Sequence, residues 1–177
     1  RHLEERGYIQ QRGKTRSKTR RWSLPPAQAL LDWWLNGYSD VVRSSLLLGT
    51  YRTPFADIEA LETGITEALQ GHDGWRWGGT SAGWRLSRYY RGRRETLHLD
   101  APDRALLRTL RAMPSRDGEL VILKPPGPQA LRGLTQDTAH PLLVYSEMMY
   151  ANDERSRVAA QVLRDEHLTY LNALERP

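Results

Sequence analysis

Residues 75–100 read WRWGGTSAGWRLSRYYRGRRETLHLD and predict a strand, a helix and a second strand in succession. The opening WRW has the composition of a short strand, and the GGT that follows predicts a tight turn into a helix. That helix is expected to run from Thr80 or the next residue to about Arg91. Apolar and polar residues then alternate in ETLHLD, which predicts a second strand with Leu97 and Leu99 on one face.

Helices and strands continue to alternate on both sides of this unit. Apolar residues recur at helical spacing after two proline-containing turns, and short apolar runs between turn residues mark strands. Upstream, we expect a helix over 27–38 that ends at Gly37, a strand within 44–53, and a helix from 54 to Gly71. Downstream, we expect a helix that starts at Pro102 and a buried strand over 119–124.

The C-terminal part predicts a helical hairpin. Pro141 suits the first turn of a helix, with His140 capping or packing beside it, and Asn152-Asp153 break the chain and cap a longer second helix. The apolar stripe expected on that second helix is Val158, Val162, Leu163, Tyr170, Leu171 and Leu174.

Basic residues are concentrated at the N-terminal edge. Residues 1–24 hold eight Lys and Arg against two acids, whereas the rest of the chain holds 18 basic and 19 acidic side chains. The formal net charge of +5 therefore arises from this edge. A basic cluster of this kind favours phosphate as a binding partner.

The basic segment is patterned like a folded hairpin and not like a disordered tail. It begins like the end of a helix, with Leu3 as an apolar contact and Gly7 placed for a C-terminal turn. A β-prone run follows near Ile9, then a polar basic loop over 12–19, and residues 22–24 alternate like a returning strand. This order of elements is typical of the last part of a winged-helix domain, where a helix end is followed by a strand, a basic loop and a second strand.

A wing of this kind predicts contact with duplex DNA, because its basic side chains reach phosphates or the minor groove. The residues expected to contact DNA are Arg12, Lys14, Arg16, Lys18, Arg20 and Arg21. The alternative is an ordinary hairpin with a solvated basic tip. The chain opens without Met and in mid-helix, so we expect it to be part of a longer protein, with most of the helix-turn-helix before Arg1.

A second basic group lies within the central stretch, with tyrosines interleaved and no acid among its members. Its arginines are Arg85, Arg88, Arg91, Arg93 and Arg94. They suit an auxiliary surface for DNA or RNA, with base stacking by the tyrosines. The alternative is a solvated helix paired with Glu95, Asp100 and the acids of the C-terminal helix.

Motifs for catalysis are incomplete. Gly78-Gly79-Thr80-Ser81 is similar to the motif that opens a nucleotidyltransferase site, but that site needs a pair of acids about 10 residues later, and only Glu95 is present. A phosphate-binding loop would need a Lys that this stretch lacks. The simpler interpretation is a tight turn whose small residues allow close packing. We therefore expect no catalytic residues.

Metal ligands do not cluster at the spacing that a metal site needs. The side chains considered as suppliers are His72, Asp73, His98, Asp100, Asp137 and His140. We expect no metal and no cofactor.

The chain of 177 residues also lacks Cys, which excludes disulfides and thiol nucleophiles. No apolar run approaches the roughly 18 residues of a membrane span, so we expect no membrane partner and a cytoplasmic location.

Three segments resemble one family. HPLLVYSEMMYANDERSRVAAQVLRDEHL (140–168), the central stretch 75–100 and LEERGYIQQRGKTRSKTRRWSL (3–24) are similar to AbiEi-type antitoxins and transcriptional regulators of type IV toxin-antitoxin systems. The first segment carries the His-Pro-Leu-Leu-Val-Tyr start of a helix pair and an Asp-x-Arg turn at Asp153 and Arg155.

The resemblance implies a winged helix-turn-helix that represses its own operon at inverted repeats, joined to an α/β domain associated with antitoxin activity. The implied partner is double-stranded operator DNA; a homodimer on the DNA is compatible with it, and direct contact with a toxin is not required. The expected class is α+β, with the end of a winged helix at 1–24, an α/β antitoxin-like domain at 25–139 and a helical hairpin at 140–177 packed on it. The alternative is an RNA- or protein-binding module that uses the basic surface over 85–94, and a nucleotide-processing enzyme is the least favoured function.

Overall fold

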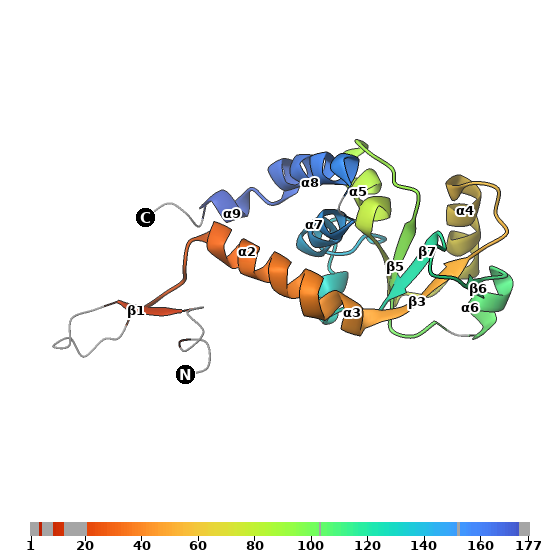
Figure 1. Cartoon of the computed structure of the whole chain (residues 1–177), viewed down its shortest axis with the longest axis horizontal. Helices are drawn as coiled ribbons and strands as arrows, with labels where there is room; N and C mark the ends of the chain where they lie inside the picture. Colours follow the sequence, from red (N-terminus) through yellow and green to blue (C-terminus); the bar gives the residue numbers. More distant parts are fainter. Residues whose placement is uncertain (1–3, 5–8, 13–20, 103, 152, 174–177) are drawn as a thin grey trace.

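The computed structural model describes residues 4, 9–12, 21–102, 104–151 and 153–173. In this part of the chain, helices pack around a five-stranded sheet in the order β4-β5-β7-β3-β6, which confirms the predicted α+β class (Figure 1). None of the helices among these residues is both long and apolar enough to cross a membrane.

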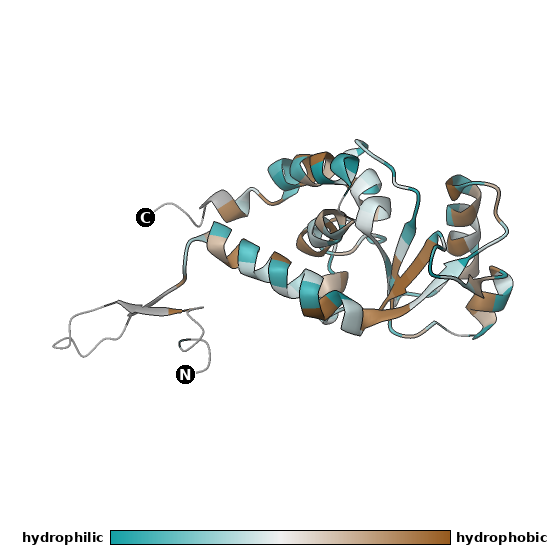
Figure 2. Cartoon of the chain, in the orientation of Figure 1, coloured by the Kyte–Doolittle hydropathy of each residue, from teal (hydrophilic) through white to brown (hydrophobic). Residues whose placement is uncertain are grey.

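The sheet uses each strand that the sequence predicts after residue 40 and adds one short edge strand, β6. Its strands are β3 (Leu47–Arg52), β4 (Trp75–Gly78), β5 (Glu95–Leu99), β6 (Met113–Pro114) and β7 (Leu120–Leu123). β5 and β7 run parallel, and the other neighbouring pairs run antiparallel. Every residue of β7 is buried, as its apolar sequence at the sheet centre requires (Figure 2).

The helices pack against one another and against the sheet. Their bounds, with those of the π-helical turn η1 and the 3-10 turn η2, are α2 (Ala27–Gly37), η1 (Tyr38–Val42), α3 (Arg43–Leu46), α4 (Ile58–Ala68), α5 (Gly79–Ser87), α6 (Arg104–Thr109), η2 (Pro128–Leu131), α7 (Pro141–Tyr150), α8 (Glu154–His167) and α9 (Tyr170–Ala173). α5, α7 and α8 pack side by side (Figure 1). They share one apolar core with the sheet, which includes Ala82, Met148, Leu163 and Leu97.

Gly37 does not end the first long helix, contrary to the sequence prediction. Its backbone is helical, with φ −63° and ψ −37°, and the helix continues through η1 and α3 to Leu46. The continuation is stabilised by Tyr38, which is fully buried and hydrogen-bonded to Glu147, and by Val42, which packs against the core. Tertiary contacts therefore override the weak stop signal of one glycine.

Two other helix predictions also need correction. α5 ends at Ser87 and not near Arg91, because Arg88 adopts a left-handed conformation with φ 56° and caps the helix. On α8, Val158 is exposed, and the buried face is formed by Ala159, Ala160 and Leu163. Small alanines let α8 lie close to α5 and α7. The helix also ends at His167, so the exposed Tyr170 belongs to α9, and Leu174 lies outside the described residues.

The N-terminal strands form an antiparallel hairpin. β1 (Gln10–Arg12) pairs with β2 (Arg21–Ser23) in a register that sets Arg12 opposite Arg21. Figure 1 shows this pair of strands apart from the larger α/β body, joined to it by the residues before α2. Arg12, the first residue of the predicted loop, belongs to β1, and residues 13–19 of that loop lie outside the described residues. Of the helix end predicted before Gly7, only Glu4 is described, and it is helical.

Candidate nucleic-acid interface and arginine pocket

A buried polar cluster lies where α5 begins. Glu147 of α7 is only 5% exposed, and its Oε2 accepts a hydrogen bond of 2.6 Å from the backbone N–H of Gly79. Its Oε1 accepts a 2.9 Å hydrogen bond from the hydroxyl of Tyr38, and Nε2 of the fully buried His98 lies 3.2 Å from the same oxygen. The cluster links the first long helix, β5, α5 and α7.

The environment keeps the carboxyl group of this cluster charged. Burial works to raise the pKa of Glu147, but the facing His98, the charge of Arg43 and the hydrogen bond from Tyr38 outweigh it, and the pKa lies below its usual value of 4.5. Burial, followed by the charge of Glu147, raises the pKa of Tyr38 above its usual value of 10.0, so the phenol remains a donor. The cluster is therefore a buried anion held by fixed donors.

The GGT sequence is explained by how closely α5 approaches this cluster. A Cβ atom on Gly78 would lie 2.5 Å from Oε2 of Glu147 and 2.7 Å from Nε2 of His98. Gly79 has φ +49°, in the region that favours glycine, and a Cβ there would lie 2.8 Å from Oγ1 of Thr96. The two glycines thus allow α5 to start directly on the buried carboxylate, which accounts for the motif by packing.

Next to this cluster lies a cavity of about 530 Å³ that we call the arginine pocket. Four arginines line it: Arg43 at the start of α3, Arg93 and Arg94 in the loop before β5, and Arg155 in the first turn of α8. Tyr90, Tyr150, Glu147 and Asp153 are also among its lining residues. The guanidinium of Arg43 lies over the ring of Tyr150, 4.0 Å from its centroid.

The predicted auxiliary surface over residues 85–94 is divided into two parts. Arg85 and Arg91 form ion pairs with Glu62 of α4, and Arg85 also pairs with Asp137 at 3.3 Å and covers the ring of Trp77. The acids that pair with these arginines therefore come from α4 and the loop before α7. Glu95 is instead buried, and burial raises its pKa.

The other arginines of that group are differently placed. Arg88, Arg93 and Arg94 are all exposed; Arg88 lies 5.5 Å over the ring of Trp84, whereas Arg93 and Arg94 line the arginine pocket. The described residues offer neither Arg93 nor Arg94 a carboxylate within 4.0 Å. Arg93 and Arg94 are therefore the members of the predicted surface that face this cavity.

The hairpin residues predicted to contact DNA are described only in part. The backbones of Arg12 and Arg21 face each other across the β1–β2 ladder. Lys14, Arg16, Lys18 and Arg20 lie outside the described residues.

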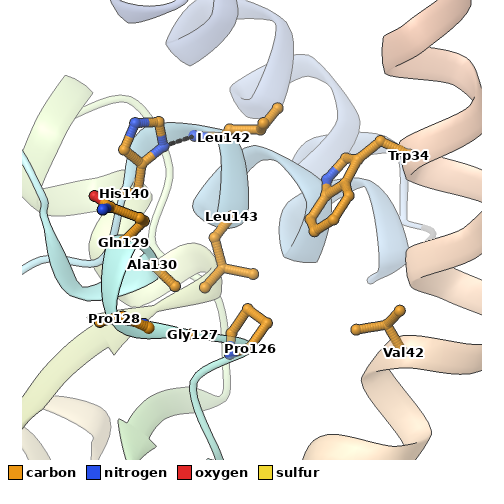
Figure 3. A pocket seen from close by; sticks show the side chains of 10 residues that line it. All are labelled: Trp34, Val42, Pro126, Gly127, Pro128, Gln129, Ala130, His140, Leu142 and Leu143. Atoms are coloured by element: carbon orange, nitrogen blue, oxygen red, sulfur yellow. Dashed lines mark hydrogen bonds between the residues drawn. The ribbon is translucent and has the colours of Figure 1, made fainter. Parts of the chain in front are cut away.

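A separate cavity of about 590 Å³ is mostly apolar (Figure 3). Trp34 and Val42 line it from the first long helix, and residues 126–130 line it from the loop around η2. His140 lies at its edge, where Nδ1 accepts a 3.2 Å hydrogen bond from the backbone N–H of Leu142 and caps α7, as predicted. Burial lowers the pKa of His140, which keeps this acceptor neutral.

Sequence reasoning missed the buried cluster and half of the pocket. Tyr38 and Glu147 are 109 positions apart, and neither stands in a motif. Arg43 is an isolated basic residue in the sequence, and Arg155 stands out only as part of the Asp-x-Arg turn, so neither was expected to join Arg93 and Arg94. A Glu in the apolar run HPLLVYSEMMY was the one available signal, because a charge on a buried helix needs a partner.

The fold is thus a small α+β domain that presents an arginine-lined cavity and carries a basic hairpin at its N-terminal side. Residues 24–169 match the family described as transcriptional regulator, AbiEi antitoxin, of type IV toxin-antitoxin systems, and the chain belongs to this family. It is a family of regulators and not one of enzymes. No curated protein and no solved structure matches the chain.

Proposed function

We propose that this protein is a DNA-binding transcriptional regulator, antitoxin-like, that represses its own operon. The observation that carries the proposal is the β1–β2 ladder, which sets Arg12 opposite Arg21, while the sequence between the two strands holds four further basic residues. The family match begins at residue 24, after the hairpin. The regulator class is therefore supported by the α/β body, and the DNA contact by the hairpin.

The hairpin acts through phosphate contacts. Each Lys or Arg that neutralises a phosphate releases condensed counterions, so affinity rises with the number of such contacts and falls with salt. These contacts fix the register of the protein on the duplex and carry no base information of their own. The hairpin contacts therefore account for affinity and not for the choice of DNA sequence.

The remaining features of the proposal follow from the family. The partner is double-stranded operator DNA, bound by a homodimer at inverted repeats in the cytoplasm. Toxin neutralisation does not require direct contact between the two proteins. The ion pairs of Arg85 and Arg91 within the domain leave the surface over 85–94 less suited to act as a nucleic-acid interface by itself.

A reporter fused to the promoter region of the protein's own gene tests this function. We expect the full-length protein to repress the reporter and the triple variant Lys14→Ala, Arg16→Ala, Lys18→Ala to release repression by about tenfold or more, because three phosphate contacts are lost. The charge-matched control is Arg108→Ala, Arg116→Ala, Arg132→Ala, three exposed arginines outside the hairpin. Equal repression by both triple variants, at equal protein levels, would refute the role of the hairpin.

A further inference from the structure

We propose that the arginine pocket binds a nucleoside polyphosphate, with its phosphates held by Arg43, Arg93, Arg94 and Arg155. This site is separate from the hairpin and goes beyond the regulator function. It rests on three properties of the pocket: an excess of unpaired positive charge, donors brought together from separate elements, and aromatic side chains in a cavity of suitable size.

The charge of the pocket is not balanced by its own acids. Two carboxylates line it against four arginines, and the charge of Arg43 acts on one of them, Glu147, so an excess of positive charge remains. Glu147 accepts from Gly79 and Tyr38, and Asp153 caps α8 by accepting a 2.9 Å hydrogen bond from the backbone N–H of Ser156. Within the described part of the chain, none of the four pocket arginines lies within 4.0 Å of a carboxylate. A ligand with several negative charges would offset the repulsion among them.

The four guanidinium groups approach the cavity from three separate places in the chain. Arg43 comes from the first long helix, Arg93 and Arg94 from the loop before β5, and Arg155 from α8. The Nε–H of Arg43 is buried and has no acceptor among the described residues. Each guanidinium can donate two parallel hydrogen bonds to two oxygens of one phosphate. Donors from three sides therefore suit a chain of phosphates better than a single carboxylate. The N-terminus of α5 takes no part, because Glu147 already occupies it.

Size and aromatic lining favour a nucleotide over a strand of nucleic acid. A cavity of about 530 Å³ lies within the range of roughly 300–1,000 Å³ that holds small molecules. Tyr90 and Tyr150 line it, and Tyr150 is 43% exposed although Arg43 lies over one side of its ring. An exposed aromatic face beside bound phosphates provides a stacking surface for a base.

Isothermal titration of the full chain with ATP, GTP, inorganic tripolyphosphate and adenosine tests this site. We expect ATP or GTP to bind more tightly than tripolyphosphate, and adenosine to bind far more weakly than both. The double variant Arg93→Ala, Arg94→Ala should weaken nucleotide binding by at least about tenfold, because charge-assisted hydrogen bonds are lost. Arg155→Ala should weaken it independently, and the control Arg108→Ala, Arg132→Ala should leave it within about twofold.

Three results would overturn the inference: no binding of any triphosphate at millimolar concentration, affinity unchanged in both pocket variants, or tripolyphosphate binding as tightly as the nucleotides. Tighter binding of a single-stranded RNA oligomer through the same arginines would assign the pocket to a different ligand and also contradict it. Thermal unfolding of each variant checks that it folds, and both mutated sites are exposed. The titration contains no DNA duplex, so a negative result would not contradict the proposal that the hairpin binds DNA.

Discussion

Replacing Glu147 with Gln is expected to lower the free energy of unfolding by about 3 kcal/mol at neutral pH. The carboxylate accepts two charge-assisted hydrogen bonds, from Gly79 and Tyr38, and such bonds contribute about 1.5–3 kcal/mol each. Glutamine keeps one acceptor oxygen, but its amide N–H₂ group then faces one of these two donors and cannot accept from it. The substitution also removes the charge that faces His98. Urea unfolding measures the difference, with the exposed Glu67→Gln on α4 as control.

The same variant gives a test with pH. The pKa of Glu147 is lowered in the folded protein, so its contribution is fully present above the unfolded value of 4.5 and is lost as the pH falls below it. The gap in unfolding free energy between the wild type and Glu147→Gln should therefore narrow in acid. A gap that stays constant or widens below pH 4.5 would contradict the assignment of a buried anion.

Replacing Gly78 with Ala is expected to lower the free energy of unfolding by about 2–3 kcal/mol. Its backbone, with φ −123° and ψ −172°, suits any residue, so the cost arises from crowding alone. The added methyl group would lie 2.5 Å from the carboxylate of Glu147 and 2.7 Å from the ring of His98, both of which are buried. Relief requires moving the polar cluster, which costs hydrogen bonds as well as packing.

Gly37 provides the matched control for that substitution. It lies within a helix, and a Cβ on it would meet no atom within 4 Å. Gly37→Ala is expected to raise the unfolding free energy by about 0.5–1 kcal/mol, since alanine restricts the unfolded chain and favours the helix. The two alanines should thus shift the urea midpoint in opposite directions. A Gly78→Ala variant at least as stable as the wild type would refute the close approach of α5 to Glu147.

The sequence predicted most of the elements because their signals are local. The alternation in ETLHLD and the apolar run at 119–124 gave β5 and β7, and Pro141 with the Asp153 cap gave α7 and α8. The wrong helix boundaries have different causes: α5 ends early at the left-handed Arg88, whereas the first long helix continues because of a contact with a distant residue. Gly37 failed as a stop since Tyr38 beyond it is anchored to Glu147.

The candidate sites were predictable only where their residues are neighbours in sequence. Arg93 and Arg94 stood out in the run RGRR, but Arg43 and Arg155 join them only after the chain has folded. Arg85 and Arg91 looked equally available in sequence, and Glu62 on α4 binds both. Pairing across distant elements leaves no pattern in a single sequence. The sequence therefore could not distinguish the arginines that form ion pairs within the protein from those that do not.

The proposal of a DNA-binding hairpin is tested most directly by measuring duplex affinity across a range of salt concentrations. For the wild type bound to its own promoter fragment, we expect log K to fall with log salt with a slope of about −0.9 per phosphate contacted. The variant Lys14→Ala, Arg16→Ala, Lys18→Ala should flatten that slope by about 2–3, while the control Arg108→Ala, Arg116→Ala, Arg132→Ala leaves it unchanged. An identical slope in the wild type and the hairpin variant would show that the hairpin does not contact the duplex.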